Sequence, residues 1–249
     1  MRRLLVLIRS LLTIELRHPA VLFWNFAFPI GVLLLNGAIF GARDEVPGTT
    51  AAWLTAGIIV LNIMAGALLG DATWLVNVRE QGILQRVQAT PLPAGALVFA
   101  YAVVRLLLVL LQAALIVLVA VLALGARFTP GGLLAAALLA LIGAMAFLLI
   151  GQALAAVAPS VGVANAVGQV IYFPLMFISN LFLPIEIMPE WLAAVARWTP
   201  AFMLVDLLRP AMVDVPAIQA GLLNLLGLAL FGAAGLAVAA RFFRWQPWR

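Results

Sequence analysis

Residues 78–93 read Val-Arg-Glu-Gln-Gly-Ile-Leu-Gln-Arg-Val-Gln-Ala-Thr-Pro-Leu-Pro, and they form the only long polar interruption in the first half of the chain. Of the 249 residues, 66% are hydrophobic and 9% are charged. The apolar stretches on both sides reach the roughly 20 residues that a helix needs to cross a bilayer. They are continuous and rich in Leu and Ala, which favours helices over a β-barrel. The sequence therefore predicts an all-α polytopic membrane protein in which residues 78–93 lie outside the lipid.

The apolar runs and the breakers between them divide the chain into elements. In the first 18 residues, arginines fall on one arc of a helix and leucines on the other, which is typical of a helix lying in the membrane interface; an ordinary start of the first span is the alternative. Pro189, Pro200 and Pro210 interrupt the stretch before the last span, so we expect short re-entrant helices there. The expected elements of a single domain (1–249) are an interfacial helix at 1–18, transmembrane helices at 19–40, 53–76, 97–124, 133–157, 163–183 and 218–240, a short water-exposed helix at 79–90, and external re-entrant helices at 185–210.

Six spans put both termini on the same side of the membrane as residues 79–90. Ten of the 14 basic residues, all of them arginine, fall on that side, and the acidic residues concentrate on the other. By the positive-inside rule, both termini and residues 79–90 are cytoplasmic, and residues 185–210 are external. We therefore expect a multi-pass protein of the cytoplasmic (inner) cell membrane. Because the arginines cluster at the ends of apolar spans, their excess indicates orientation in the bilayer and no nucleic-acid partner.

Residue types that the chain lacks exclude several classes of function. It contains no lysine, so it cannot carry the Gly-x-x-x-x-Gly-Lys-Ser/Thr loop that binds ATP phosphates. It contains no cysteine and one histidine, which excludes disulfides, thiolate metal sites and a histidine metal site. An intramembrane enzyme would need a nucleophile and a base within reach of each other, and the predicted spans offer no such pair. We expect no cofactor and no metal in this chain, and an ATP-driven function would need a partner subunit.

Two charged residues are predicted inside the spans at similar depth, Asp71 in the second and Arg105 in the antiparallel third. A charge in hydrocarbon is costly, so an intramembrane acid indicates a functional site unless it is paired. A structural ion pair between Asp71 and Arg105 is the preferred hypothesis, and a substrate-binding or proton-carrying role for Asp71 stays open. An ion-coupled secondary transporter would need further buried acids or broken helices near the midplane, whereas Asp71 stands alone near the cytoplasmic edge.

Residues 79–90 are predicted to form a short helix with Ile83, Leu84 and Val87 on one face, a pattern that fits a groove on a soluble partner. The run Arg79-Glu80-Gln81-Gly82-Ile83-Leu84, followed by Ala89-Thr90-Pro91-Leu92, resembles the loop after the second span of ABC-2 type transporter permeases. That family more often has Thr, an acid and two leucines at positions 83, 85, 87 and 88. The resemblance implies a coupling helix seated on an ATP-binding subunit, with contacts at Arg79, Glu80, Gly82, Ile83, Leu84, Arg86, Val87, Thr90 and Pro91.

A second motif lies far along the chain. The runs Asn180-Leu-Phe-Leu-Pro184 and Met188-Pro-Glu-Trp-Leu192, then Pro200 and Val205-Asp206-x-Leu-Arg209, are similar to the external re-entrant signature of the same permeases. The site residues of this motif are Pro184, Pro189, Trp191, Pro200, Asp206 and Arg209. Together with the six spans and the amphipathic start, the resemblance covers essentially the whole chain.

The resemblance implies the permease subunit of an ATP-driven exporter. It implies two permeases, as a homodimer or a heterodimer, and two ABC ATPase subunits per transporter, which bind ATP and Mg²⁺. The exit path would follow the dimer interface, and its expected lining residues are Phe23, Asn25, Phe26, Ile30, Asn165, Gln169 and Phe173. This mostly apolar lining suits an amphipathic or hydrophobic cargo such as a drug, an antibiotic or a lipid. Export of a lipid-linked glycan is the alternative, followed by an ion-coupled secondary transporter.

Overall fold

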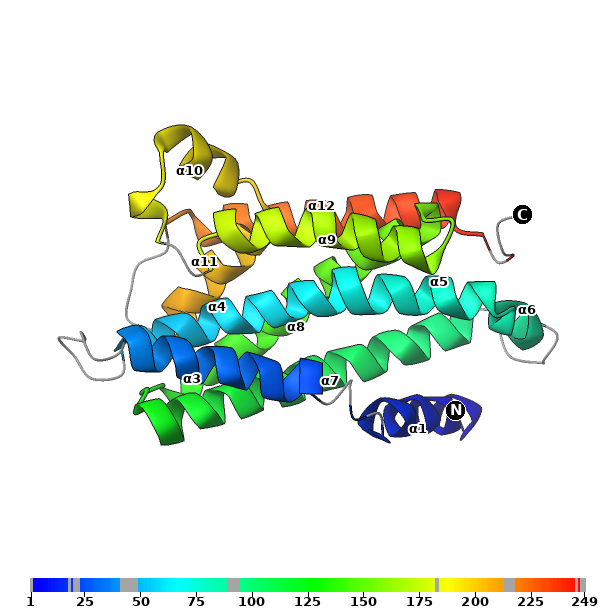
Figure 1. Cartoon of the computed structure of the whole chain (residues 1–249), viewed down its shortest axis with the longest axis horizontal. Coiled ribbons are helices and arrows are strands. Elements are labelled where there is room, and N and C mark those ends of the chain that lie inside the picture. The colour runs from blue at the N-terminus through cyan, green and yellow to red at the C-terminus, as the bar shows by residue number, and fades with distance from the viewer. Residues whose placement is uncertain are drawn as a thin grey trace.

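The computed structural model describes residues 2–17, 19, 23–40, 49–88, 95–181, 184–212, 218–244 and 246. Within these ranges every regular element is a helix, and no strand is present (Figure 1). The elements in chain order are α1 (Arg2–Arg17), the π-helix η1 (Phe23–Ala27), α3 (Phe28–Phe40), α4 (Thr49–Ala65), the π-helix η3 (Gly66–Asp71), α5 (Ala72–Glu80), α6 (Ile83–Gln88), α7 (Gly95–Leu124), α8 (Pro130–Val157), α9 (Val161–Ile178), the 3₁₀ turn η4 (Ile185–Ile187), α10 (Glu190–Ala196), α11 (Pro200–Met212) and α12 (Gly221–Phe242).

Among the described residues, five helices are long and apolar enough to cross a membrane, with mean hydropathies between 1.7 and 3.1. They are Thr50–Glu80, Gly95–Leu124, Pro130–Val157, Val161–Ile178 and Gly221–Phe242. The pair α10 and α11, bent by 84° at its break, would make a sixth crossing if it is one span. The first expected span, 19–40, contains the apolar helix Phe23–Ile39, which is shorter than these five. Its first turn is the π-helix η1, a form that apolar composition does not reveal.

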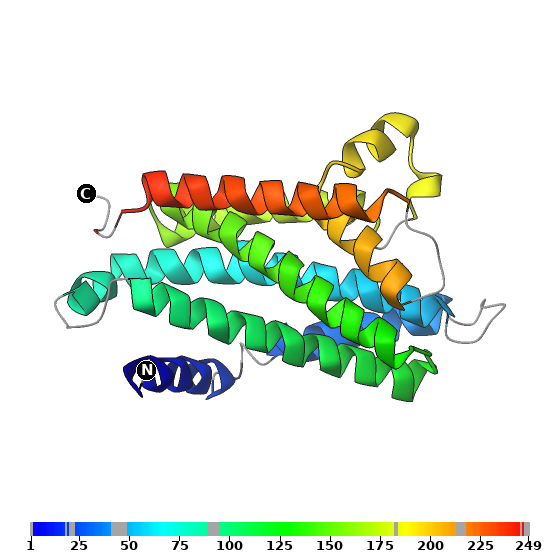
Figure 2. The ribbon, with the colours of Figure 1, turned by 180° about the vertical axis from the view of Figure 1, so that it is seen from behind.

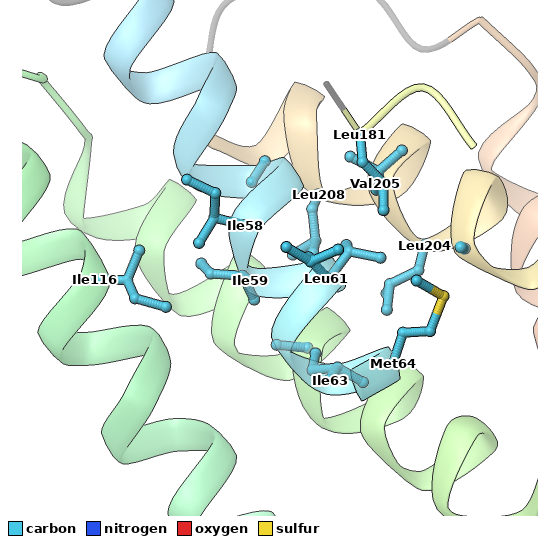
Figure 3. Close-up of a cluster of buried hydrophobic side chains, with 14 of the residues drawn as sticks. Ile58, Ile59, Leu61, Ile63, Met64, Ile116, Leu181, Leu204, Val205 and Leu208 are labelled. Carbon is cyan, nitrogen blue, oxygen red and sulfur yellow. The ribbon is translucent and has the colours of Figure 1, made fainter. Parts of the chain in front are cut away.

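The helix that runs through α4, η3 and α5 lies at the centre of the bundle. Within its most apolar 18 residues 78% of positions are buried, against 17% to 39% in the other four candidate spans. It packs against α3, α7, α8, α9 and α11. Figure 3 shows part of this core, where Ile58, Leu61 and Met64 of α4 meet residues of α7 and α11.

Glycines let neighbouring helices approach the central helix closely. A Cβ atom on Gly151 of α8 would collide with the carbonyl oxygen of Ala67, and one on Gly168 of α9 would lie 2.6 Å from the carbonyl oxygen of Leu68. Lipid tails are as apolar as leucine, so helices in a bilayer associate mainly through close van der Waals packing of this kind. Two helices therefore contact the backbone of η3 at positions where only glycine fits.

The polar segment that contains α6 and the one that contains α10 lie at opposite ends of the bundle. In Figures 1 and 2, α6 lies at one end together with α1 and the last turns of α12, and α10 lies at the other. Leu7 and Leu11 of α1 pack against a cluster formed by Val78, Leu84 and Leu97. The N-terminal helix is thus attached to the end of the bundle that carries α6.

Candidate functional site

A glycine turns the chain from the central helix into α6. The amide of Gln81 donates to the carbonyl of Asn77 (3.0 Å) and the amide of Gly82 to that of Arg79 (3.0 Å), which closes the last turn of α5. Gly82 has a φ of +67°, the left-handed conformation that commonly ends a helix at glycine. Its own carbonyl then accepts from Arg86 (3.1 Å), the first bond of α6. These bonds define the turn through which α6 follows the end of the central helix.

The apolar face of α6 packs on this chain. Leu84 is fully buried in the cluster with Val78 and Leu97, and Ile83 and Val87 pack against that cluster. The prediction that Ile83, Leu84 and Val87 face a partner's groove is corrected for Leu84, because a six-residue helix needs these contacts to stay attached to the bundle. The exposed face of α6 and its preceding turn carries Gln81, Gln85 and Arg86. Thr90 and Pro91 lie outside the described residues.

Arg79, one of the residues expected to contact an ATP-binding subunit, is buried inside this chain. Its side chain is 1% exposed, and Nη1 donates to the carbonyl oxygen of Ala155 (2.9 Å) while Nη2 donates to that of Ala158. The neighbouring Glu80 is exposed, but its Oε1 accepts a hydrogen bond from the amide of Val161 (3.2 Å). Both residues therefore contact the turn between α8 and α9. This turn lies about 80 residues further along the chain, so the sequence pattern could not indicate the contact.

The structure brings Asp71 and Arg105 together at the end of η3. Arg105 Nε lies 2.5 Å from Asp71 Oδ1, and the hydroxyl of Tyr101 donates to the same oxygen (2.8 Å). The ring of Trp74 stacks on Tyr101 with centroids 3.6 Å apart. Sequence reasoning missed Trp74 and Tyr101 as members of this cluster. Helical spacing was the available signal, because Tyr101 stands four residues before Arg105 and Trp74 three after Asp71.

The guanidinium of Arg105 lies against the side of η3 that carries Gly66 and Gly70. A Cβ atom on Gly66 would collide with Arg105 Nη2, so this glycine leaves the space that the guanidinium fills. A π-helix is rare and is frequently found at functional sites. The ion pair thus fastens α7 to the one irregular turn of the central helix.

The seven residues expected along the exit path fall into two groups. Phe23, Asn25, Phe26 and Ile30 lie on η1 and α3, and Asn165, Gln169 and Phe173 lie on α9. Helix α3 packs on α4, and α9 packs on η3 and α5, so both groups flank the central helix. Two of the three phenylalanines, Phe23 and Phe173, are about half exposed.

Asn165 and Gln169 are both exposed on α9, and Gln169 Nε2 donates to Asn165 Oδ1 (3.1 Å). The side chain of Asn25 is half-buried, and its backbone carbonyl accepts a hydrogen bond from Asn62 Nδ2 (3.3 Å). The polar groups that α9 presents outward are therefore these two amides.

The second motif, at residues 180–209, takes part in a network that joins α4, α11 and α12. The Asp206 carboxylate accepts hydrogen bonds from the amides of Ile218 and Gln219 (2.8 Å each) and from Asn224 Nδ2 (2.9 Å), which anchors the start of α12. The buried guanidinium of Arg209 donates to the carbonyl of Asn180 and lies 3.5 Å above the ring of Trp53.

The three prolines of the motif mark the starts of the short helices. Pro184 precedes η4, Pro189 precedes α10 and Pro200 is the first residue of α11, positions where proline costs no backbone hydrogen bond. Trp191, by contrast, is 69% exposed on α10. Within the described ranges, no group of three or more His, Cys, Asp or Glu side chains could hold a metal ion.

Comparison with known proteins gives two matches. The family model described as "ABC-2 type transporter" matches residues 2–213, which include α1, α6 and the external motif. The chain is also 21% identical over 187 residues to "Putative transport permease YvfS" of Bacillus subtilis (strain 168). That alignment covers 75% of this chain and 76% of that protein.

Proposed function

The chain belongs to the ABC-2 type transporter family, and from that premise we propose that it is the transmembrane permease subunit of an ATP-driven exporter. Permeases of this family are the membrane-spanning subunits and generally work with ABC ATPase subunits. ATP and Mg²⁺ would bind in two such partner subunits, because this chain has no lysine for a phosphate-binding loop. The proposed location is the cytoplasmic membrane, with α1, α6 and the end of α12 on the cytoplasmic side, where most arginines fall.

The position and the surface of α6 carry this proposal. The helix projects from the end of the central helix and buries Leu84 against its own chain, and with its preceding turn it exposes Gln81, Gln85 and Arg86. We propose that this exposed face, with the half-buried Ile83 and Val87 at its edge, is the contact with the ATPase subunit. A short helix docked on a partner is a common mode of recognition. Because α6 continues from the central helix through Gly82, a push on α6 would reach the core of the bundle directly.

In the proposed cycle, closure of the ATPase subunits on ATP displaces α6 and tilts the central helix. The tilt changes the interface between two permeases from open toward the cytoplasm to open toward the outside. This is a two-state element whose equilibrium is biased by a partner that binds one state better. The exposed amides of Asn165 and Gln169 support a second permease at α9, since the bond between them uses only part of their hydrogen-bonding capacity and lipid hydrocarbon could not satisfy the rest.

The expected path residues favour an amphipathic cargo. Phe23, Phe26, Ile30 and Phe173 would supply apolar surface, and Asn165 and Gln169 would supply hydrogen bonds. A hydrophobic drug, an antibiotic or a lipid fits this combination. Export of a lipid-linked glycan remains the second candidate from the family resemblance, and stacked aromatic side chains along the path would favour it.

The proposal is tested by co-expressing the intact chain with ABC ATPase subunits from the same genome and purifying the chain from detergent-solubilised membranes. We expect one ATPase subunit to co-purify and to hydrolyse ATP in the complex. Arg86→Glu should reduce its recovery about tenfold or more, because a reversed charge at a contact opposes docking by several kcal/mol. Arg241→Glu, at an exposed arginine of α12 on the same end of the bundle, is the matched control.

Recovery of no ATPase subunit with the wild-type chain would refute the proposal. Equal recovery with Arg86→Glu and Arg241→Glu would refute the assignment of the docking face to α6. Cargo class is tested on the same complex in proteoliposomes, with ethidium and a fluorescently labelled phospholipid as probes. ATP-dependent movement of either probe supports an amphipathic cargo, and movement of neither contradicts it.

A further inference from the structure

Two neighbouring residues at the end of the central helix hold opposite sides of one tight turn. Arg79 binds the carbonyl oxygens of Ala155 and Ala158 at the end of α8, and Glu80 binds the amide of Val161 at the start of α9. Within the turn itself, Ser160 caps α9 by accepting from Val163 (3.3 Å). The α8–α9 turn is thus bonded to the central helix at both of its ends.

The charges of this pair match the two helix ends that they contact. The last carbonyls of a helix and the first amides of the next lack partners inside the helix and carry partial negative and positive charge respectively. Arg79 supplies the cation at the carbonyl end and Glu80 the anion at the amide end. The planar guanidinium presents its N–H donors in a fixed fork, and two of its nitrogens reach the two carbonyl oxygens.

Apolar packing around the pair makes the junction a compact unit. Leu75 and Val76 of α5 are buried together with Ala155, Ala158 and Ala164 of the two helices that meet there. Of the five candidate spans in the described residues, α9 is the least buried, with 17% of its 18 residues buried. Helix α9 is therefore fastened to the central helix at its first turn and has much of its remaining surface free of contacts within this chain.

We propose that Arg79 and Glu80 are positioning residues that transmit the displacement of α6 to α9. This inference rests on the proposed function, since it assumes that an ATPase subunit drives α6. When α6 moves, α5 moves with it through Gly82. The hydrogen bonds of Arg79 and Glu80 then carry the α8–α9 turn in the same direction. Helix α9, with Asn165 and Gln169 on its outward face, then changes position as one body with α5.

The test measures the distance between α5 and α9 in the purified complex with its ATPase subunit. The chain has no cysteine, so Asn77→Cys and Val170→Cys, both at exposed positions, accept nitroxide labels without competing sites. Labelled chain is diluted with unlabelled chain so that only distances within one copy are recorded. Distances are compared between the nucleotide-free complex and the complex trapped with ADP and vanadate.

With Arg79 and Glu80 intact, we expect the same distance in both states, because the two helices move together. In Arg79→Ala and in Glu80→Ala the fraction of complexes at that distance should fall by about two- to thirtyfold in the trapped state, the range of coupling that single residues carry. Glu80→Gln, which keeps the acceptor oxygen, should stay closer to the wild type than Glu80→Ala. Arg241→Ala, an exposed arginine on α12, should behave as the wild type.

A purely structural role would lower yield or thermal stability in both nucleotide states and leave the distance independent of nucleotide. If Arg79→Ala does not fold, Glu80→Ala decides the question, because Glu80 is exposed and its loss leaves no buried group without a partner. An unchanged distance between α5 and α9 in the trapped Glu80→Ala complex would overturn the inference. If that complex still hydrolyses ATP, the proposed function stands. Failure of the wild-type chain to bind any ATPase subunit would instead overturn the proposed function.

Discussion

Replacing Arg105 with methionine removes the guanidinium that lies 2.5 Å from the Asp71 carboxylate. Breaking a buried ion pair by removing one partner costs about 3–5 kcal/mol, because the remaining charge stays buried without its counter-ion. The Tyr101 hydroxyl remains as a donor to Asp71, and a hydrogen bond to a charged group contributes about 1.5–3 kcal/mol. We therefore expect the lower end of the range, a loss of about 3 kcal/mol in Arg105→Met.

A chain of this size loses roughly 2–4 °C of melting temperature per kcal/mol, so Arg105→Met should melt about 6–12 °C below the wild type. The double variant Asp71→Asn with Arg105→Met removes both charges and should recover at least half of that loss, since replacing a whole buried pair is often nearly neutral. Arg127→Met, at an exposed arginine, is the control and should melt with the wild type.

Melting is followed by size-exclusion chromatography of heated, detergent-solubilised protein, because thiol-reactive dyes have no cysteine to report on. A melting temperature for Arg105→Met within about 2 °C of the wild type would refute the argument that the pair stabilises the bundle. Full recovery of stability in the double variant without recovery of ATP-driven transport would show that the pair also has a functional role. If the charge swap Asp71→Arg with Arg105→Asp were as inactive as Asp71→Asn alone, the pairing would not be what activity requires.

Three further predictions concern packing and the external network. Asp206→Ala removes the acceptor for two backbone amides and one side chain at the start of α12, and should lower the unfolding free energy by about 3 kcal/mol in the same melting assay. Gly151→Ala would push a methyl group onto a carbonyl of the central helix and should lower the melting temperature, whereas Gly31→Ala meets open space and should raise it slightly or leave it unchanged. Trp53→Leu removes the ring beneath Arg209 and should cost about 1–2 kcal/mol, and an equal melting temperature would show that this cation–π contact contributes nothing.

The helical class and most element positions could be predicted because they depend on local properties of the sequence. Long apolar runs must be helices in lipid, and Pro159 with Ser160 marks the turn between α8 and α9. The proximity of Asp71 and Arg105 also followed from their equal depth in antiparallel spans. These features need only the length of each run and the direction of the chain.

The contacts of Arg79 and Leu84 could not be predicted because they depend on parts of the chain that are distant in sequence. An apolar stripe on a short helix fits a groove on a partner and a groove on its own bundle equally well. Leu84 takes the second option, against Leu97 and the N-terminal helix. An arginine after an apolar span is ordinarily an interfacial anchor, and only the α8–α9 turn gives Arg79 its buried carbonyl partners.

The π-helices were also beyond sequence reasoning. Their i→i+5 hydrogen bonds leave hydropathy unchanged, so no local signal marked η1 in the first expected span or η3 in the second. The roles of the residues on η1, α3 and α9 in a cargo path stay predictions.

The burial of the central helix sets how freely different parts of the chain can diverge between species. Residues of α4, η3 and α5 face other helices on most sides, so almost any change of volume there disturbs several neighbours at once. Much of α9 and α12 is free of such contacts, and one apolar residue can replace another there at little cost. In a deep mutational scan for membrane expression, we expect mutational tolerance to be lowest along residues 50–80 and to rise on the outer faces of α9 and α12. Selection for function would then appear as intolerant positions on those outer faces, with Asn165 and Gln169 the first to inspect.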